Sequence, residues 1–388
     1  MKNSFPFKIA DRVETLPPSG IRAFFDLVIG MKDIISLGVG EPDFDTPWTI
    51  RESAIYSIEH GHTTYTSNKG LLELRKKIAQ HLNKKFKVDY DPENEILITV
   101  GVSEAMDLAI RALLNPHEKV IVPEPCYVSY SPMVSLAGGN PVAFITEKKH
   151  DFKIDIKSLE KYKSSGAKAI ILNYPSNPTG TSYTQDELSK LSRTIQKMNL
   201  LVISDEIYSD LSYDIPHTCF ASLPEMKGQT LLLNGFSKGY AMTGWRIGYA
   251  AGPRPLIEAM TKIHQYTIMC APIMGQWAAC EAIKNGDSVL APMIKEYEKR
   301  RNFVVESLNE MGLDCHKPAG AFYAFPSIQK TEMDSMSFAH QLLEKEKVAV
   351  VPGTAFGSSG EGFIRLSYAT GMDRLKEALS RIKKFINV

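Results

Sequence analysis

Short apolar runs alternate with longer segments of helical periodicity from about residue 95 onward. The runs are continuously apolar, which is what strands buried on both faces of a parallel sheet require. Alternation of strand and helix is typical of a parallel sheet with helices on both faces. The predicted strands are 96–100, 119–122, 141–145, 169–172, 200–203, 230–233 and 247–251, with helices at 101–113 and 129–136.

The pattern changes after about residue 290, where a charged helix over 294–311 is followed by short apolar runs and two further helices. Loss of strict alternation indicates a smaller α+β domain. We expect the helical stretch 255–284 to link the two parts, and the segment 16–28 to form an arm that leads into a helix. The predicted fold is α/β, a large domain with a mostly parallel seven-stranded sheet sandwiched by helices plus a smaller α+β domain. The expected division is 1–45 for the arm and part of the small domain, 46–285 for the large domain and 286–388 for the small C-terminal domain.

Composition excludes several classes of protein. At roughly 150 residues per domain, 388 residues correspond to two or three domains. Lys plus Arg (45) against Asp plus Glu (44) leaves a charge of +1, which offers no footprint for nucleic acid or an anionic membrane. Five cysteines without C-x-x-C spacing argue against a disulfide framework and a zinc ribbon, and favour a reducing cytoplasm. The N-terminus lacks the apolar core of a secretory signal, and no run approaches a membrane span.

Three common site motifs are absent or incomplete. Gly38-Val39-Gly40 follows an apolar run like the start of a dinucleotide fingerprint, but Asp43 stands at the third glycine and Pro42 prevents the required helix start. The histidines show no metal-ligand spacing, so no metal site is expected. No G-x-S-x-G elbow of a serine hydrolase is present.

A strand that ends in Gly101 and leads directly into a helix aims free N–H groups at one point. The positive end of the helix dipole adds to them, so Gly101, Val102 and Ser103 suit a phosphate. A tight turn without a ligand is the alternative reading of the same three residues.

Polar residues also follow the next strands, at the edge of an α/β sheet where ligands bind. The prolines, glycine and asparagines of 173–180 indicate an irregular loop. Asp205 ends a buried strand, where a carboxylate needs a cationic partner to offset its desolvation. A helix cap or a surface acid is the alternative for Asp205.

Lys238 follows the strand 230–233, and Arg246 lies eight residues further on. A lysine is usually a solvated surface charge. At this edge, desolvation and a neighbouring arginine lower the pKa of a lysine, which then serves as a Schiff-base amine, and the arginine is free to pair with phosphate.

Five motifs occur in the order and spacing of one family. They are S-L-G-V-G-E-P-D-F at 36–44, S-N-P-T-G at 176–180, S-D-E-I-Y at 204–208, S-K-x-x-x-x-x-G-x-R at 237–246 and F-I-R-L-S-Y at 363–368. With them the chain resembles, over essentially its whole length, the class I and II aminotransferases of fold type I, which use pyridoxal 5′-phosphate. The likeness is greatest to the bacterial and archaeal branch of aspartate, aromatic and alanine aminotransferases.

The resemblance implies a role for each matching residue. Lys238 would hold the cofactor covalently and then carry a proton between substrate and cofactor. Asp205 would pair with the pyridine nitrogen. Tyr208 and Asn177 would hydrogen-bond its phenolic oxygen, and the Tyr127 ring would stack on the pyridine.

The phosphate and the substrate are assigned in the same way. The phosphate would be bound by Gly101, Val102, Ser103, Ser237 and Arg246, with Tyr65 reaching it from the neighbouring subunit. This implies an obligate homodimer with shared active sites. Arg365 would bind the substrate α-carboxylate as a bidentate pair, together with Asn177 and the Gly40 backbone. From the residues alone, Arg365 is equally an edge-strand arginine.

Two positions depart from part of the family. Some aspartate aminotransferases have a phosphate-binding serine where this chain has Gly235, and part of the branch has a lysine that grips the side-chain carboxylate of aspartate where this chain has Ser103. A dedicated dicarboxylate enzyme is therefore disfavoured. The resemblance predicts a cytoplasmic ping-pong aminotransferase that moves the amino group of an aromatic, alanine-like or aspartate donor to a 2-oxo acid such as 2-oxoglutarate.

Two rival functions stay open. A carbon–sulfur β-lyase uses the same scaffold, because the same carbanion can eliminate a β-substituent. Aminotransferase-like domains also occur as sensors fused to DNA-binding domains. Only about twenty residues precede the match here and the charge is +1, so no helix-turn-helix module is expected.

Overall fold

A seven-stranded sheet forms the centre of the computed structural model, which describes residues 7–18, 20 and 33–387. The strand order is β2-β8-β7-β6-β5-β3-β4, and β8 runs against all the others. The fold prediction is thereby confirmed, including a mostly parallel sheet. The strands are β2 (Ile96–Thr99), β3 (Lys119–Glu124), β4 (Asn140–Ile145), β5 (Ala167–Asn173), β6 (Leu201–Asp205), β7 (Thr230–Gly235) and β8 (Gly248–Ala251).

Helices cover both faces of this sheet, which explains the continuous apolar runs. In β5, Ala169 and Ile171 pack in the cluster that contains α5 and α9, whereas Ile170 and Leu172 pack against α8 on the other face. Each strand residue is buried whichever way it points. The helices of the first face are α5 (Gly101–Leu113), α6 (Tyr130–Leu136) and α9 (Arg254–Thr267), and those of the second are α7 (Ile156–Glu160) and α8 (Gln185–Met198).

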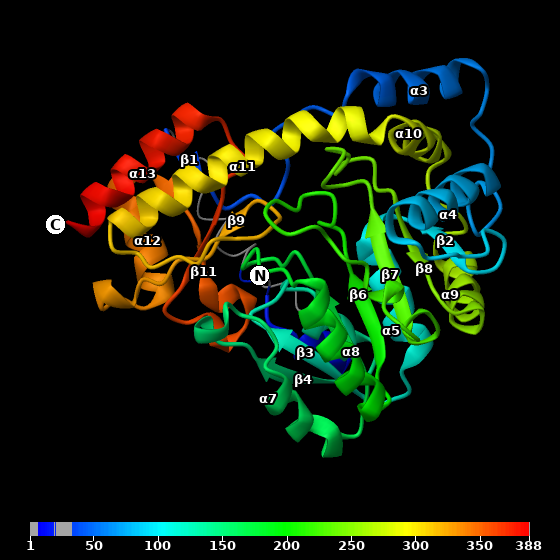
Figure 1. Cartoon of the computed structure of the whole chain (residues 1–388), viewed down its shortest axis with the longest axis horizontal. Helices are drawn as coiled ribbons and strands as arrows, with labels where there is room; N and C mark the ends of the chain where they lie inside the picture. The colour runs from blue at the N-terminus through cyan, green and yellow to red at the C-terminus, as the bar shows by residue number, and fades with distance from the viewer. Residues whose placement is uncertain (1–6, 19, 21–32, 388) are drawn as a thin grey trace.

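Two small sheets lie beside the large one. The parallel pair β1–β10 brings a segment near the N-terminus next to a C-terminal one, and β12 is the middle strand of the antiparallel order β11-β12-β9. Figure 1 shows α11 running from the side of α10 to the region of α12 and α13. These strands are β1 (Ile35–Ser36), β9 (Tyr323–Ala324), β10 (Val348–Ala349), β11 (Val351–Pro352) and β12 (Ile364–Ser367). The remaining helices are α1 (Asp11–Glu14), α3 (Trp48–Glu59), α4 (Leu72–Phe86), α10 (Ile273–Lys284), α11 (Gly286–Glu310), α12 (Ser335–Glu346) and α13 (Met372–Ile386).

Two helix predictions were wrong in their bounds. The stretch 255–284 is two helices, α9 and α10, because Pro272 stands before α10 and cannot donate the backbone hydrogen bond that would continue α9. The charged helix begins at Gly286 rather than at residue 294, although Pro292 lies inside it. Burial of Leu290 and Met293 in the main core outweighs the local cost of that proline.

The arm predicted over 16–28 lies mostly outside the described residues. In the part of the chain that the structure describes, none of the helices combines the length and apolar character that a membrane crossing needs. Nor do the described residues bring together three or more His, Cys, Asp or Glu side chains in a group suited to a metal ion.

Candidate active site

A cavity of about 730 Å³ lies at the carboxyl edge of the large sheet and extends to the small sheets. Its walls come from the segments that follow β1, β3, β5, β6 and β7, from the start of α5, and from β9 and β12. Most of the predicted site residues meet in it. Those that line it are Gly40, Val102, Ser103, Tyr127, Asn177, Asp205, Tyr208, Ser237, Lys238, Arg246 and Arg365.

Lys238 follows β7 and points its amine into the cavity. Its Nζ donates a hydrogen bond to the Gly40 carbonyl at 2.7 Å. Burial, followed by the positive charge of Arg365, lowers the pKa of Lys238 to about 8. About a tenth of the amine is therefore neutral, and hence nucleophilic, at pH 7, and about half of it is neutral at pH 8.

Asp205 ends β6 and is buried in the cavity wall. The Tyr130 hydroxyl donates to its Oδ2 at 2.7 Å, and the Ile207 N–H donates to its Oδ1 at 3.2 Å. Burial raises the pKa of Asp205 to about 6, against the lowering effect of the Tyr130 hydrogen bond. The sequence predicted a cationic partner for Asp205, but none of the described residues places a cation in direct contact with it. Lys238 acts on Asp205 only as a nearby charge. The carboxylate is thus placed to receive a cationic nitrogen from a ligand.

The turn between β2 and α5 requires its glycine. Gly101 has a φ of +72°, and a Cβ on it would lie 2.7 Å from Nη2 of Arg246. The Arg246 guanidinium is therefore packed directly on the first residue of a 13-residue helix. Free N–H groups, a helix dipole and a guanidinium together suit a phosphate. Val102 and Ser103 line the cavity. Gly101 is not part of the lining, and it allows the turn because it has no side chain to clash with Arg246.

Glu104 holds the same turn from the opposite side. Its carboxylate accepts hydrogen bonds from the Val100 N–H at 2.5 Å and interacts with Nδ1 of His264, on α9, at 2.7 Å. The turn is thereby tied to both the sheet and the neighbouring helix.

Arg365 is buried on β12, and the edge-strand reading of it is wrong because β12 is the middle strand of its sheet. Its Nη1 donates to Oδ1 of Asn177 at 2.9 Å, and its Nη2 donates to the Gly38 carbonyl at 2.5 Å. The guanidinium carbon lies 4.5 Å from the Tyr323 ring centroid and 4.8 Å from that of Phe356. Nε has no hydrogen-bond partner among the described residues. A buried guanidinium with an unused donor fits an anionic ligand.

The remaining predicted residues divide between the cavity and the surface. Tyr127 and Ser237 line the cavity, as does Tyr208, whose hydroxyl lies 2.8 Å from that of Tyr323. Tyr65 is 79% exposed and lies outside the cavity of this chain. Its expected contribution to a neighbouring subunit is compatible with that position.

The glycine at 235, where part of the family has a serine, has a packing reason. A Cβ on Gly235 would lie 2.8 Å from the Cα of Gly248 and 3.0 Å from the Ile247 carbonyl oxygen. The close approach of β7 and β8 leaves no room for a side chain. The missing hydroxyl is therefore tied to the way these two strands pack.

Among the lining residues that were not predicted from the sequence, Tyr130 and Tyr323 contact predicted site groups. Tyr130 stands one turn beyond Tyr127 at the start of a helix, and this spacing was the available signal. Tyr323 belongs to an apolar run that reads only as a strand, and its neighbour Tyr208 is 115 residues away in the chain.

The chain belongs to the aminotransferase class I and II family, whose pattern matches residues 32–382. The Bacillus subtilis protein YugH is 52% identical over 379 residues, which cover 98% of each chain. The aspartate aminotransferase of Pyrococcus abyssi is 44% identical over 97% of this chain and 98% of its own. The crystal structure of an aromatic aminotransferase from Pyrococcus horikoshii superposes with a TM-score of 0.90 at 42% identity, covering 95% of this chain and 98% of that one.

The protein is therefore an aminotransferase, close to the aspartate and aromatic enzymes, and acts on amino and oxo acids. The family to which it belongs uses pyridoxal phosphate in amino-acid metabolism.

Proposed function

We propose that this chain is a ping-pong aminotransferase that moves the α-amino group of an L-amino acid to a 2-oxo acid such as 2-oxoglutarate. The observation that carries the proposal is one cavity that holds a buried lysine of lowered pKa, a buried carboxylate and a buried guanidinium with an unused donor. Lys238 serves for covalent attachment, Asp205 for a cationic ring nitrogen, and Arg365 for a carboxylate.

The donor set fits pyridoxal 5′-phosphate. Lys238 would bond its aldehyde carbon, Asp205 would pair with its pyridine nitrogen, Tyr208 and Asn177 would donate to its phenolic oxygen, and Tyr127 would stack on its ring. The phosphate would be held by Gly101, Val102, Ser103, Ser237, Arg246 and the partner subunit's Tyr65. When bound, the cofactor supplies an electron-withdrawing ring that stabilises negative charge at the substrate α-carbon.

The chain's own groups then carry out three tasks. Arg365 orients the donor by its α-carboxylate, which brings the donor's Cα–H within reach of Lys238. The Nζ of Lys238 has a pKa of about 8, and in its neutral form it would remove that proton and deliver it to C4′ of the cofactor. The Gly40 carbonyl, which already accepts from Nζ at 2.7 Å, restrains the amine on the substrate side of the cavity.

The lining of the cavity supports a broad choice of donor. Among the described residues that line it, the cations are Lys238, Arg246 and Arg365, and the proposal assigns all three. None of these remains for a second carboxylate, while Val39 and Val128 offer apolar surface. Aromatic and alanine-like amino acids are thus the favoured donors. Aspartate is kept because relatives such as the Pyrococcus abyssi enzyme are aspartate aminotransferases.

The proposal includes a cytoplasmic homodimer and a division into domains at 46–285 and 286–388, with residues 1–45 forming the N-terminal arm and part of the small domain. Exposure of Tyr65 supports the shared site. Pairing of β1 with β10 supports assigning the segment before residue 46 to the small domain.

The test is the half-reaction of purified protein loaded with cofactor. Addition of an amino donor should convert the absorbance of the lysine-bound aldehyde form to that of the free amine form, and 2-oxoglutarate should reverse the change. A Lys238→Ala protein should still bind the cofactor, but the conversion should be much slower than in the wild-type protein. Failure of every donor with the wild-type protein would contradict the proposal. Release of pyruvate and ammonia together with thiocysteine from cystine, or with homocysteine from cystathionine, without an oxo acid would indicate the β-lyase instead.

A further inference from the structure

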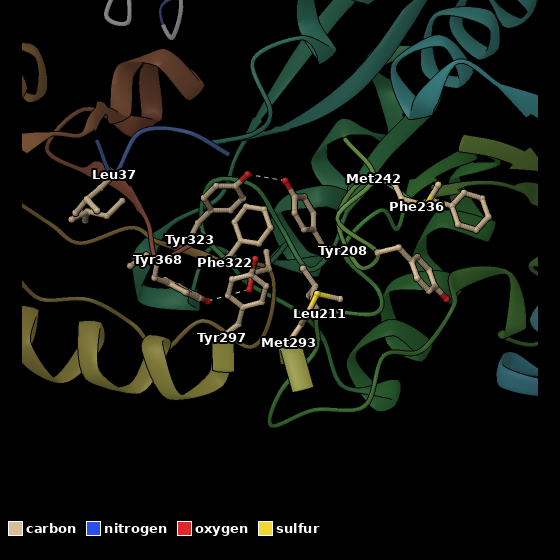
Figure 2. Packing of buried hydrophobic residues seen from close by; sticks show 14 of the residues in the cluster. Leu37, Tyr208, Leu211, Phe236, Met242, Met293, Tyr297, Phe322, Tyr323 and Tyr368 are labelled. Atoms are coloured by element: carbon tan, nitrogen blue, oxygen red, sulfur yellow. Dashed lines mark hydrogen bonds between the residues drawn. The ribbon is translucent and has the colours of Figure 1, made fainter. Parts of the chain in front are cut away.

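Tyr323 lies outside the five family motifs and yet contacts two of the proposed site groups. It is a β9 residue, 1% exposed, and β9 pairs with β12 so that Tyr323 stands opposite Ser367. Its hydroxyl lies 2.8 Å from that of Tyr208, and its ring centroid lies 4.5 Å from the Arg365 guanidinium carbon. Tyr208 and Tyr323 belong to a buried hydrophobic cluster that also contains Phe322 and Tyr368, and Figure 2 shows their two hydroxyls directed toward each other.

The shared hydrogen bond has two possible directions, with consequences for Tyr208. Each tyrosine hydroxyl carries one proton and accepts through its oxygen. If Tyr208 donates to Tyr323, it has no proton left for a ligand. If Tyr323 donates to Tyr208, the Tyr208 proton is free to point into the cavity.

The Tyr323 hydroxyl also lies against the backbone of Gly40. A Cβ on Gly40 would come within 2.4 Å of the Tyr323 oxygen, so position 40 has no room for a side chain. The carbonyl of the same residue accepts the hydrogen bond from Lys238 Nζ at 2.7 Å. Tyr323 therefore packs against the peptide that restrains the amine.

The Tyr323 ring is one of two aromatic faces on Arg365, the other being Phe356 at 4.8 Å. A guanidinium between two rings is held in plane by cation–π attraction while its N–H edge stays available. Since Arg365 is buried, this attraction is little screened by water.

We propose that Tyr323 is a positioning residue that acts on both halves of the site. Its hydroxyl donates to Tyr208, which directs the Tyr208 proton to the cofactor's phenolic oxygen, and its ring holds the Arg365 guanidinium for the substrate carboxylate. The inference rests on the proposed function, because it assigns Tyr208 and Arg365 their roles.

The first variant, Tyr323→Phe, removes the hydroxyl and keeps the ring. Loss of the donor makes Tyr208 a weaker donor itself, because hydrogen bonds in a chain polarise one another. The phenolic oxygen is then less stabilised as an anion. The pH midpoint of the absorbance of the lysine-bound cofactor, measured without substrate, should rise by about half a unit. KM for the amino donor should stay within about twofold, since the ring still faces Arg365.

The second variant, Tyr323→Leu, removes the ring as well. The amino donor should then bind less well, with KM raised about tenfold relative to Tyr323→Phe, because Arg365 loses one cation–π partner. Binding of a non-reactive carboxylate inhibitor should weaken by a similar factor, which gives a readout independent of turnover.

Tyr368→Phe is the matched control. Tyr368 is fully buried in the same cluster (Figure 2), its hydroxyl donates to the Ala321 carbonyl at 3.2 Å, and it is not among the residues that line the cavity. This variant should leave both the absorbance midpoint and KM unchanged. A Tyr323→Phe midpoint that falls, or moves no more than that of Tyr368→Phe, overturns the inference, as does an unchanged KM in Tyr323→Leu. A wild-type protein that forms no borohydride-reducible bond between Lys238 and the cofactor overturns the proposed function itself.

Discussion

At the scale of single residues, the site depends on two buried groups whose charges are displaced in opposite directions. Lys238 has a pKa lowered to about 8 and Asp205 one raised to about 6. Burial is the largest cause in both cases, since each charged form loses solvation in the cavity wall. Near neutral pH the amine is therefore partly neutral and the carboxylate mostly ionised, as attachment of a cofactor with a cationic ring nitrogen requires.

The first prediction concerns the reactivity of Lys238 in cofactor-free protein. Its acylation rate should rise with pH to a half-maximum near 8, because only the neutral amine reacts, whereas an ordinary lysine has a pKa of about 10.4. Arg365→Gln removes the second cause of the lowered pKa and should move the midpoint up by about half a unit or more. Competitive labelling with mass spectrometry measures the rate. Arg111→Gln, on the surface of α5, should leave the midpoint in place; equal behaviour of the two variants would refute the assignment.

A second prediction concerns Tyr130, which lowers the pKa of Asp205 by its hydrogen bond. Tyr130→Phe should raise that pKa further above about 6, so less carboxylate is ionised at pH 7 and the acid limb of cofactor affinity shifts upward. If that pKa rises by about one unit, affinity at pH 7 should fall about twofold and recover almost fully at pH 8.5. Fluorescence titration measures it. In an Asp205→Asn background the Tyr130 change should add nothing; an additive loss there would mean that Tyr130 acts through another group.

At the scale of elements, local pattern explains how far the sequence predicts the structure. The strands and the start of α5 were predictable because continuous apolar runs and a glycine are local signals. The break between α9 and α10 was missed although Pro272 marks it, and the first turns of α11 depend on burial that no local pattern contains. Tyr323 was not predicted as a site residue, again because no local pattern contains the signal. Its contact with Tyr208 arises only when β9 packs near the end of β6.

The third prediction tests the packing of β8 against the start of α5. A Cβ on Gly248 would lie 2.7 Å from both the Gly101 carbonyl carbon and the Val102 nitrogen. Gly248→Ala should therefore displace the proposed phosphate turn, weakening cofactor affinity about tenfold and destabilising the fold by about 1–3 kcal/mol. Gly228→Ala is the control, since nothing lies within 4 Å of a Cβ there. Calorimetry and cofactor titration separate the two effects; unchanged affinity in Gly248→Ala would exclude this turn from the phosphate site.

At the scale of the whole molecule, one loop connects the sheets through the cavity. The segment after β1 accepts a hydrogen bond from Arg365 at the Gly38 carbonyl and one from Lys238 at the Gly40 carbonyl. β1 itself pairs with β10, so the loop belongs to a small sheet while Lys238 follows β7 of the large one. The proposed substrate and cofactor sites are thus joined by backbone, and any movement between the sheets acts on both.

The last prediction tests whether two subunits build each site. If Lys238 acts within its own subunit and Tyr65 in its partner's site, a heterodimer of Lys238→Ala and Tyr65→Ala chains has one site free of both changes. With two affinity tags to isolate it, this heterodimer should show about half the wild-type activity per dimer at limiting cofactor, above either mutant homodimer.

The matched control pairs Lys238→Ala with Arg246→Ala. Both residues line the cavity of one chain, so this heterodimer has one defect in every site and should regain nothing. Tyr65, 79% exposed and outside that cavity, should behave differently only if it reaches across the interface. Equal activity of the two heterodimers would place Tyr65 outside the partner's site, and the exposed ring would then need another explanation than a shared phosphate contact.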